Sequence, residues 1–318
     1  MIIAPHITSE FAYFNALFIQ PTPWCARNCN GCYVKGFEEV QGVTESEDTL
    51  IGDLISEIGG RIRVNQVTLA IDKKPNDKIR SYAMDTIVSN FLERIGYSEE
   101  QGHKIEFHAT VHTLNDLLEY PHFWDSPHQK LDMLSISHLN VQDYIPELRT
   151  YVAPHINWNL TVDPTINMDK IKSTFQKIAS TVDSVYLVLH KPNLGHFFDE
   201  QAFVVHQDFI RFIRTMPEEI RNKVHIDGCI QDSKHFLDTG YGCSSNVSRF
   251  QVWPNGSVTG CAYNQNRVTG PATNLDELFK NFVTAKKTYE FDKCKIPNHI
   301  DPKHPRVYAR QNYLEIID

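Results

Sequence analysis

Residues 13–33 read YFNALFIQPTPWCARNCNGCY, an apolar and aromatic run that leads into three closely spaced cysteines. The run Tyr13–Gln20 is rich in residues that favour extended backbone, so it predicts a β-strand. The segment directly after it contains Cys25, Cys29 and Cys32. What these cysteines can do depends on whether the strand opens a longer series of strands and helices.

Further strand-like runs follow, and stretches with helical spacing of apolar residues lie between them. This alternation predicts βα units and a parallel sheet. We expect an α/β fold, a partial (β/α)6 TIM-type barrel whose chemistry lies at the carboxyl ends of the strands. The expected strands are Tyr13–Gln20, Gln66–Asp72, Lys104–Val111, Leu131–His138, His155–Val162 and Ser184–His190, and the expected helices are Ser46–Gly59, Asp77–Ile95, Val141–Tyr151, Met168–Thr181 and His206–Met216.

Two of these runs, LDMLSIS and VYLVLH, are apolar enough to suggest burial on both faces, with helices on one side and a filled interior on the other. Polar residues gather where the runs end. Those that we single out as candidates for the barrel rim are Asp72, His108, Ser137, His138, Asp163, His190 and Lys191.

The pattern changes near residue 225 to short pieces separated by turn residues. Asn255–Gly256 between two short apolar runs predicts a hairpin, and a helix is expected at Asn274–Thr288. We therefore predict two domains, the barrel over residues 1–225 and a small C-terminal domain over residues 226–318.

Composition limits the function classes. The chain has 318 residues, 41% of them hydrophobic, which is enough for a large core, and its net charge of −8 argues against nucleic acid as the partner. The first residues lack a signal-peptide pattern and no long apolar run occurs, so we expect a cytoplasmic protein with no membrane partner. Its seven cysteines are unevenly spaced, which in a reducing compartment favours metal binding over disulfides.

The first cysteine group suits an open metal site. Thiolates are soft ligands for zinc or for iron–sulfur clusters. Structural zinc sites use four protein ligands, and no fourth ligand lies near Cys25, Cys29 and Cys32. Three cysteines on a four-iron cluster would leave one iron open, which is a catalytic feature.

The pattern C-x3-C-x2-C directly after the first strand of a βα series resembles the radical S-adenosylmethionine (SAM) superfamily. The resemblance implies a [4Fe–4S] cluster on Cys25, Cys29 and Cys32, with SAM bound to the open iron. The reduced cluster would cleave SAM to a 5′-deoxyadenosyl radical, which takes a hydrogen atom from the substrate. An electron donor such as flavodoxin or ferredoxin is implied as well.

Two positions depart from the family pattern. The family usually has an aromatic residue directly before the third cysteine. Here that position is Gly31, and the aromatic residue Tyr33 follows the cysteine instead. The second expected strand ends in Ala70, Ile71 and Asp72 in place of Gly-Gly-Glu, so main-chain carbonyls there would bind the SAM amino group. The resemblance, by strand order, adds cofactor contacts at Ser137 and Thr161, and the other cofactor-binding candidates are Tyr33 and His190.

The second cysteine group resembles the SPASM and twitch extensions of radical SAM enzymes. Cys243 precedes the hairpin by twelve residues, Cys261 follows Gly256 after four, and a helix leads to Cys294. The hairpin would return Cys261 to the neighbourhood of Cys243. The resemblance implies at most one auxiliary [4Fe–4S] cluster, with twitch fitting better than SPASM, and the fourth ligand is open between Cys229, His299 and substrate.

Cys229 has three interpretations. It is a buried thiol that packs as a small apolar side chain, the fourth ligand of the auxiliary cluster, or a catalytic hydrogen-atom donor that quenches a substrate radical. The sequence does not decide among them.

The predicted function is that of a radical SAM enzyme that modifies a peptide by epimerisation, crosslinking or oxidation. One alternative is radical dehydrogenation or rearrangement of a small molecule or nucleoside. A second alternative, from another class, is a non-catalytic iron–sulfur electron carrier or binding protein.

Overall fold

The computed structural model of the chain describes residues 6–22, 45–71, 78–125, 129–137, 145–162, 167–189, 200–226, 249–260 and 269–287. All seven cysteines lie outside these ranges, as do Tyr33, Asp72, His138, Asp163, His190, Lys191 and His299. The predictions made for these residues therefore remain predictions.

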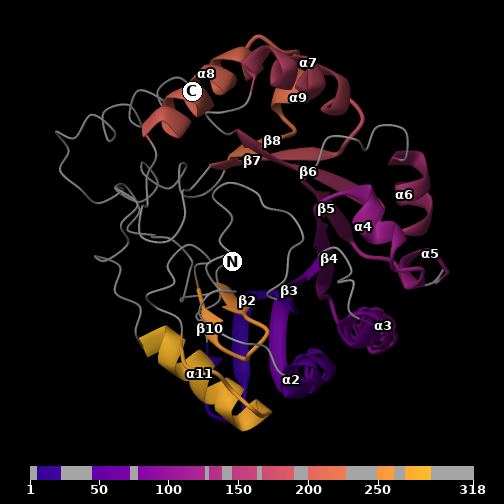
Figure 1. Ribbon diagram of the computed structural model, residues 1–318, viewed down its shortest axis with the longest axis vertical. Coiled ribbons are helices and arrows are strands. Elements are labelled where there is room, and N and C mark those ends of the chain that lie inside the picture. Colours follow the sequence, from indigo (N-terminus) through magenta and orange to yellow (C-terminus); the bar gives the residue numbers. More distant parts are fainter. Residues whose placement is uncertain are drawn as a thin grey trace.

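The described residues form one curved, largely parallel sheet with helices around its outside, the architecture of a partial TIM-type barrel (Figure 1). The strand order is β10-β9-β2-β3-β4-β5-β6-β7-β8, and β1 pairs with β2 beside this path. The strands are β1 (His6–Ile7), β2 (Ala12–Ile19), β3 (Ile62–Ile71), β4 (Glu106–Val111), β5 (Met133–Ile136), β6 (His155–Val162), β7 (Ser184–Leu189), β8 (Val224–Ile226), β9 (Arg249–Val252) and β10 (Val258–Thr259).

Helices connect the parallel strands and cover the convex face of the sheet (Figure 1). Their burial pattern explains their position, because apolar side chains such as Phe91 of α3 and Phe175 of α7 are fully buried. The helices are α2 (Glu45–Ser56), α3 (Lys78–Glu100), α4 (Leu114–Leu118), α5 (His122–Asp125), α6 (Ile145–Tyr151), α7 (Met168–Ile178), α8 (Glu200–Ile213), α9 (Glu218–Arg221) and α11 (Leu275–Lys287).

The six strands and the helices expected from the sequence are confirmed, with shifts of a few residues at their ends. The agreement is closest for His155–Val162, which is β6 without any shift. The sequence pattern missed the short elements β1, β8, α4, α5 and α9, which are too brief to show a periodicity.

The C-terminal hairpin continues the same sheet. Strand β9 pairs in parallel with β2, with Leu17 opposite Phe250 and Ile19 opposite Val252. On the outer face the rings of Phe14, Phe250 and Phe282 form a buried cluster with centroids 4.9–5.7 Å apart, which joins β2, β9 and α11. A separate domain over residues 226–318 remains a prediction, and the described part of that region packs directly on the barrel.

The turn of this hairpin lies at the predicted position. Trp253 donates to the Ser257 carbonyl at 2.9 Å, and Gly256 donates to the Trp253 carbonyl at 2.9 Å, so the loop has three residues. The buried Asn255 accepts from both the backbone and the hydroxyl of Ser257. These bonds fix the conformation of the turn from within.

Gly256 is required at its position for two reasons. Its φ of 74° lies in the left-handed region, which side chains other than glycine rarely adopt. A β-carbon there would lie 2.5 Å from Leu50 Cδ2 of α2 and 2.9 Å from the Ala272 carbonyl oxygen. The turn is therefore packed against two other parts of the chain.

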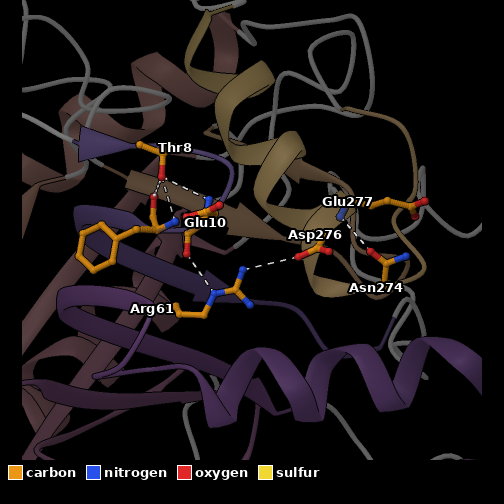
Figure 2. A network of polar contacts seen from close by, with 7 residues as sticks. Thr8, Glu10, Arg61, Asn274, Asp276 and Glu277 are labelled. Atoms are coloured by element: carbon orange, nitrogen blue, oxygen red, sulfur yellow. Dashed lines mark hydrogen bonds and ion pairs between the residues drawn. The ribbon is translucent and has the colours of Figure 1, made fainter.

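Arg61, at the start of β3, links the amino-terminal hairpin to α11 (Figure 2). Its Nε donates to the Glu10 carbonyl at 3.0 Å, and its Nη2 lies 3.6 Å from the Asp276 carboxylate. Its guanidinium also lies 4.5 Å from the centre of the Phe279 ring. Because Asp276 is exposed, the ion pair adds little. The ring contact with Phe279 is the main link from Arg61 to α11, and the backbone bond joins Arg61 to Glu10.

No helix in the described part of the chain combines the length and the apolar character needed to cross a bilayer.

We expect Gly256→Ala to lower the free energy of unfolding by about 2–4 kcal/mol, since it adds left-handed strain to overpacking. Urea denaturation monitored by circular dichroism measures this change. Gly102→Ala isolates the strain, because Gly102 has a φ of 68° and open space around it, and it should cost about 1 kcal/mol. Gly270→Ala has neither problem and should be close to neutral. Equal losses in all three variants would contradict the packing argument.

Candidate functional site

The two faces of the sheet differ in chemistry. Phe107 of β4 meets the Phe91 ring of α3 edge to face, and Trp158 of β6 contacts Phe175 of α7, so these side chains point outward to the helices. Since side chains alternate along a strand, their sequence neighbours point to the concave side. We call this concave face the inner wall. Its described members include Gln66, Thr68, Ala70, His108, Thr110, Ser135, Asn157, Asn159, Ser184, Tyr186 and Gln251.

Strand register arranges the inner wall in rows across the sheet. One row contains Ala70, Thr110, Ser135, Asn157 and Ser184, which are successive partners on five strands. Every member of this row is small or polar and none is charged. A row of this composition cannot form the aliphatic layers that fill a closed barrel.

Asn157 organises the middle of that row. Its Nδ2 donates to Ser135 Oγ at 3.1 Å and to Asn159 Oδ1 at 2.8 Å, while its Oδ1 accepts from Ser184 Oγ at 2.8 Å. The carboxamide is 5% exposed and uses both its donors and its acceptor. Three strands are therefore tied together by polar contacts on the inner wall.

The inner wall corrects one expectation from the sequence. The runs Leu131–His138 and Ser184–His190 were expected to be apolar on both faces around a filled interior. Their inner positions are mixed: Ser135, Ser184 and Tyr186 carry polar groups, whereas Met133 and Val188 are apolar. Only the outward positions are consistently apolar. Buried polar groups need hydrogen-bond partners, so the polar side chains of this wall suit a barrel that holds a polar ligand.

His108 lies on the inner wall, three residues before the end of β4, and not at the rim where the sequence had suggested it. It is only 7% exposed, and its Nε2 lies 3.4 Å from Glu106 Oε2. Its Nδ1 is buried and accepts no hydrogen bond from the described residues. Gln251 of β9 is paired with Phe18 of β2 in the sheet. Its Nε2 is also buried and has no hydrogen-bond partner among the described residues.

Burial lowers the pKa of His108 below its ordinary value of 6.5, although the carboxylates of Glu106 and Asp132 act in the opposite direction. The imidazole is therefore neutral at pH 7. Since Glu106 can only accept, the geometry favours the tautomer with the proton on Nε2, which leaves Nδ1 as an acceptor.

The lowered pKa of His108 predicts a loss of stability in acid. Its contribution to the free energy of unfolding is complete above about pH 6.5, the value in the unfolded chain, and is lost as the pH falls through the lower folded value. Urea denaturation at pH 7.5, 6 and 5 measures this loss, and His108→Leu should show a shallower pH dependence than the native chain. Tyr151→Leu, at an exposed position, is the control and should keep the native slope. A His108→Leu chain with the native slope would exclude His108 as the source.

The sequence-predicted cofactor contacts fall at the ends of the strands where they are described. Ala70 and Ile71 end β3, Ser137 follows β5 and donates its N–H to the Val111 carbonyl at 3.1 Å, and Thr161 is the exposed penultimate residue of β6. These four residues lie at the carboxyl side of the sheet, at the ends of β3, β5 and β6, with β4 between β3 and β5. Their contacts with SAM remain predictions.

The described residues next to the cysteine segments are the end of β2 and the end of β10. Gln20, at the end of β2, donates its backbone N–H to the Val252 carbonyl at 2.9 Å, and its side chain donates to the Thr22 carbonyl at 2.9 Å. The sequence reaches Cys25 three residues after Thr22 and reaches Cys261 directly after Gly260. Within the described ranges, no three His, Cys, Asp or Glu side chains gather as a metal site.

A cavity of about 600 Å³ lies at the opposite end of the strands. It is lined by Asn15 of β2, by the middle of β3, by the start of β4 and the residues before it, by the last turns of α3 and by Asp132. Gln66 and Glu106 connect it to the inner wall. Because the chemistry of barrels lies at the carboxyl ends of strands, we do not assign the functional site to this cavity.

The structure adds functional candidates that the sequence argument did not select, namely Asn157, Asn159 and Gln251. A signal was present for two of them, because polar residues alternate along β6 at Asn157, Asn159 and Thr161. Gln251 gave no such signal, since its inward position depends on the pairing of β9 with β2.

Comparison with known proteins supports the fold. No family model and no curated protein matches the sequence. Among solved structures, SuiB of Streptococcus suis is similar with a TM-score of 0.51 at 14% identity, over 91% of this chain and 68% of SuiB. A protein of Aquifex aeolicus VF5 has a TM-score of 0.38 at 11% identity, over 86% of this chain and 92% of that one, which is too weak to support an argument.

Proposed function

We propose that this chain is a radical SAM enzyme that cleaves SAM reductively and removes a hydrogen atom from a peptide substrate. The observation behind the proposal is the polar inner wall of an open barrel beneath the edge from which the Cys25, Cys29 and Cys32 segment departs. The fold is the one that the cysteine pattern led us to expect, which supports the same interpretation.

The described residues fit a polar cofactor. Two buried polar atoms on the inner wall, His108 Nδ1 and Gln251 Nε2, have no hydrogen-bond partner among the described residues, and leaving such groups unpaired costs about 1–3 kcal/mol each. Cys25, Cys29 and Cys32 would hold the iron–sulfur cluster, and the carbonyls of Ala70, Ile71 and Asp72 would accept from the SAM amino group. When bound, cluster and SAM together supply the radical chemistry.

The protein's own contribution would be binding and exclusion of water. In the described part of the chain, helices cover the apolar outer face of the sheet, so a ligand would reach the inner wall from the ends or the open side of the described barrel. Glu106 at the start of β4 is on the same face, and toward the carboxyl ends of the strands the described inner wall offers neutral donors and acceptors. Such groups match the amides of a peptide backbone, and this is why we propose a peptide before other substrates.

A second cluster on Cys243, Cys261 and Cys294 belongs to the same proposal, with Cys229 or His299 as the fourth ligand. The pairing of β9 with β2 supports it, because Gly260 lies two strands from β2, a lateral distance of about 10 Å. The alternative of Cys229 as hydrogen-atom donor is kept as a prediction.

Anaerobic reconstitution tests the proposed function. We expect the native chain to bind about eight irons, the sum of two four-iron clusters, and with dithionite and SAM to form 5′-deoxyadenosine, measured by liquid chromatography. Cys32→Ala should abolish this product because it removes a ligand of the first cluster. Cys229→Ala distinguishes the two roles of Cys229. If Cys229 is a hydrogen-atom donor, the variant still cleaves SAM. If Cys229 is a cluster ligand, the variant binds less iron.

A native chain that binds iron and SAM but yields no 5′-deoxyadenosine would overturn the proposal. That result would favour the alternative, a non-catalytic iron–sulfur carrier.

A further inference from the structure

The cavity at the amino ends of the strands is not used by the proposed function. Its volume is about 600 Å³, and small-molecule sites commonly have about 300–1,000 Å³. Every residue that lines it lies in the described part of the chain. Residues of β2, β3 and β4 and the last turns of α3 provide most of the lining. The cavity therefore belongs mainly to regular elements of the barrel.

Part of the lining is apolar. Ile105 is half-buried against the core, whereas Ile95 and Phe107 of the same lining are almost fully buried. An apolar side chain that is only partly covered gains free energy when a ligand buries it further. The lining therefore suits a ligand with a hydrocarbon segment.

Three carboxylates line the same space, from Glu99 at the end of α3, Glu106 at the start of β4 and Asp132 before β5. Asp132 is held by the backbone of Phe107, since its Oδ2 accepts from the Phe107 N–H at 2.7 Å and its own N–H donates to the Phe107 carbonyl at 2.8 Å. Glu106 Oε2 lies 3.4 Å from Nε2 of His108, which is neutral at pH 7. Two of the carboxylates are thus held in place by uncharged partners.

The lining has less positive than negative charge. Lys104 is the one lysine or arginine among the lining residues, all of which are described, and His103 is the one histidine. The cavity also lies at the carboxyl end of α3, where the aligned peptide dipoles of a helix of 23 residues leave a partial negative charge. Both features favour a cationic ligand over an anionic one.

A buried hydroxyl adds an observation that does not depend on these charges. Ser98 of α3 is a lining residue and is 1% exposed, and its Oγ has no hydrogen-bond partner among the described residues. A buried polar atom without a partner is unfavourable, and a ligand that donates to it removes this cost. Asn65 Nδ2 donates to Asn15 Oδ1 at 2.9 Å, which leaves Asn65 Oδ1 as a further acceptor.

We propose that this cavity is a second binding site, which takes a small organic ammonium ion. The carboxylates of Glu106 and Asp132 bind the ammonium group, and the hydrocarbon segment of the ligand covers Ile105. The Ser98 hydroxyl completes its hydrogen bonding with the same ligand. The inference is independent of the proposed radical chemistry, because the cavity lies at the opposite end of the strands from the carboxyl edge.

Isothermal titration calorimetry of the full-length chain at pH 7.5 tests the ligand class with three probes of equal chain length. n-Hexylammonium carries the proposed charge, 1-hexanol has the same hydrocarbon segment without a charge, and hexanoate carries the opposite charge. We expect hexylammonium to bind about tenfold more tightly than hexanol, because charge-assisted hydrogen bonds are stronger than neutral ones, and hexanoate not to bind. The affinity for hexylammonium should fall as sodium chloride is added.

Matched variants locate the bound charge. Glu106→Gln and Glu99→Gln keep the size of the side chain and remove one carboxylate from the lining, and both should weaken hexylammonium binding, by about tenfold for Glu106→Gln. Glu93→Gln is the control and should bind as the native chain does, since Glu93 is an exposed residue of α3 outside the lining and its loss changes the net charge equally. Ser98→Ala should weaken binding without lowering the melting temperature, because it removes an unpaired buried group.

Four outcomes would overturn the inference. Absence of hexylammonium binding at millimolar concentration excludes the site. Equal affinities for hexylammonium and hexanol show an apolar cavity without charge recognition, and tighter binding of hexanoate shows an anion site at Lys104. Native affinity in both lining variants, or an equal loss in Glu93→Gln, shows that the cation binds elsewhere. None of these outcomes concerns the formation of 5′-deoxyadenosine, so all of them leave the proposed function standing.

Discussion

The sheet of this protein must satisfy two environments at once, and the rest of the structure follows from how it does so. Its outer face is apolar and is buried beneath amphipathic helices, whereas its described inner face carries many polar side chains between Gln251 at one end and Tyr186 near the other. A closed barrel would have to fill such an interior with side chains. An open barrel can leave it for a ligand, and the Asn157 network keeps the polar wall ordered without one.

The second determinant is the edge of β2. Strand β1 uses the start of this edge, at Ala12 and Tyr13, and β9 uses the remainder from Ala16 to Ile19. One strand therefore receives the C-terminal hairpin, although more than two hundred residues separate the two in sequence. The buried Phe cluster makes this long-range pairing favourable, because it places three large rings out of water at the junction.

Much of the fold could be predicted because its elements have strong local signals. The alternation of β-branched runs with helical spacing identified β2 to β7, and Asn255–Gly256 identified the hairpin. The pairing of β9 with β2 could not be predicted, since it depends on a contact between distant segments and not on a local pattern. His108 was misplaced because it was counted among the strand-end residues, although the expected strand and β4 both end at Val111, three residues later.

The candidate site was predictable to a different extent. The polar alternation along β6 was visible in the sequence, but the serines of β5 and β7 were hidden among apolar neighbours. Tertiary packing decides which face of such a strand meets the helices, and a single sequence does not contain that information. The cavity at the amino ends was similarly hidden, because Glu99, Glu106 and Asp132 gather there only in the folded chain.

An open barrel has a consequence for how copies of this protein behave toward one another. Opening a barrel creates two free sheet edges, and exposed edges can pair with other chains. Here the strands at the two ends, β8 and β10, have three and two residues, whereas β2 and β3 have eight and ten (Figure 1). Among the described residues, edges this short offer few backbone groups to a second molecule, which lowers the tendency of the described sheet to pair with another chain.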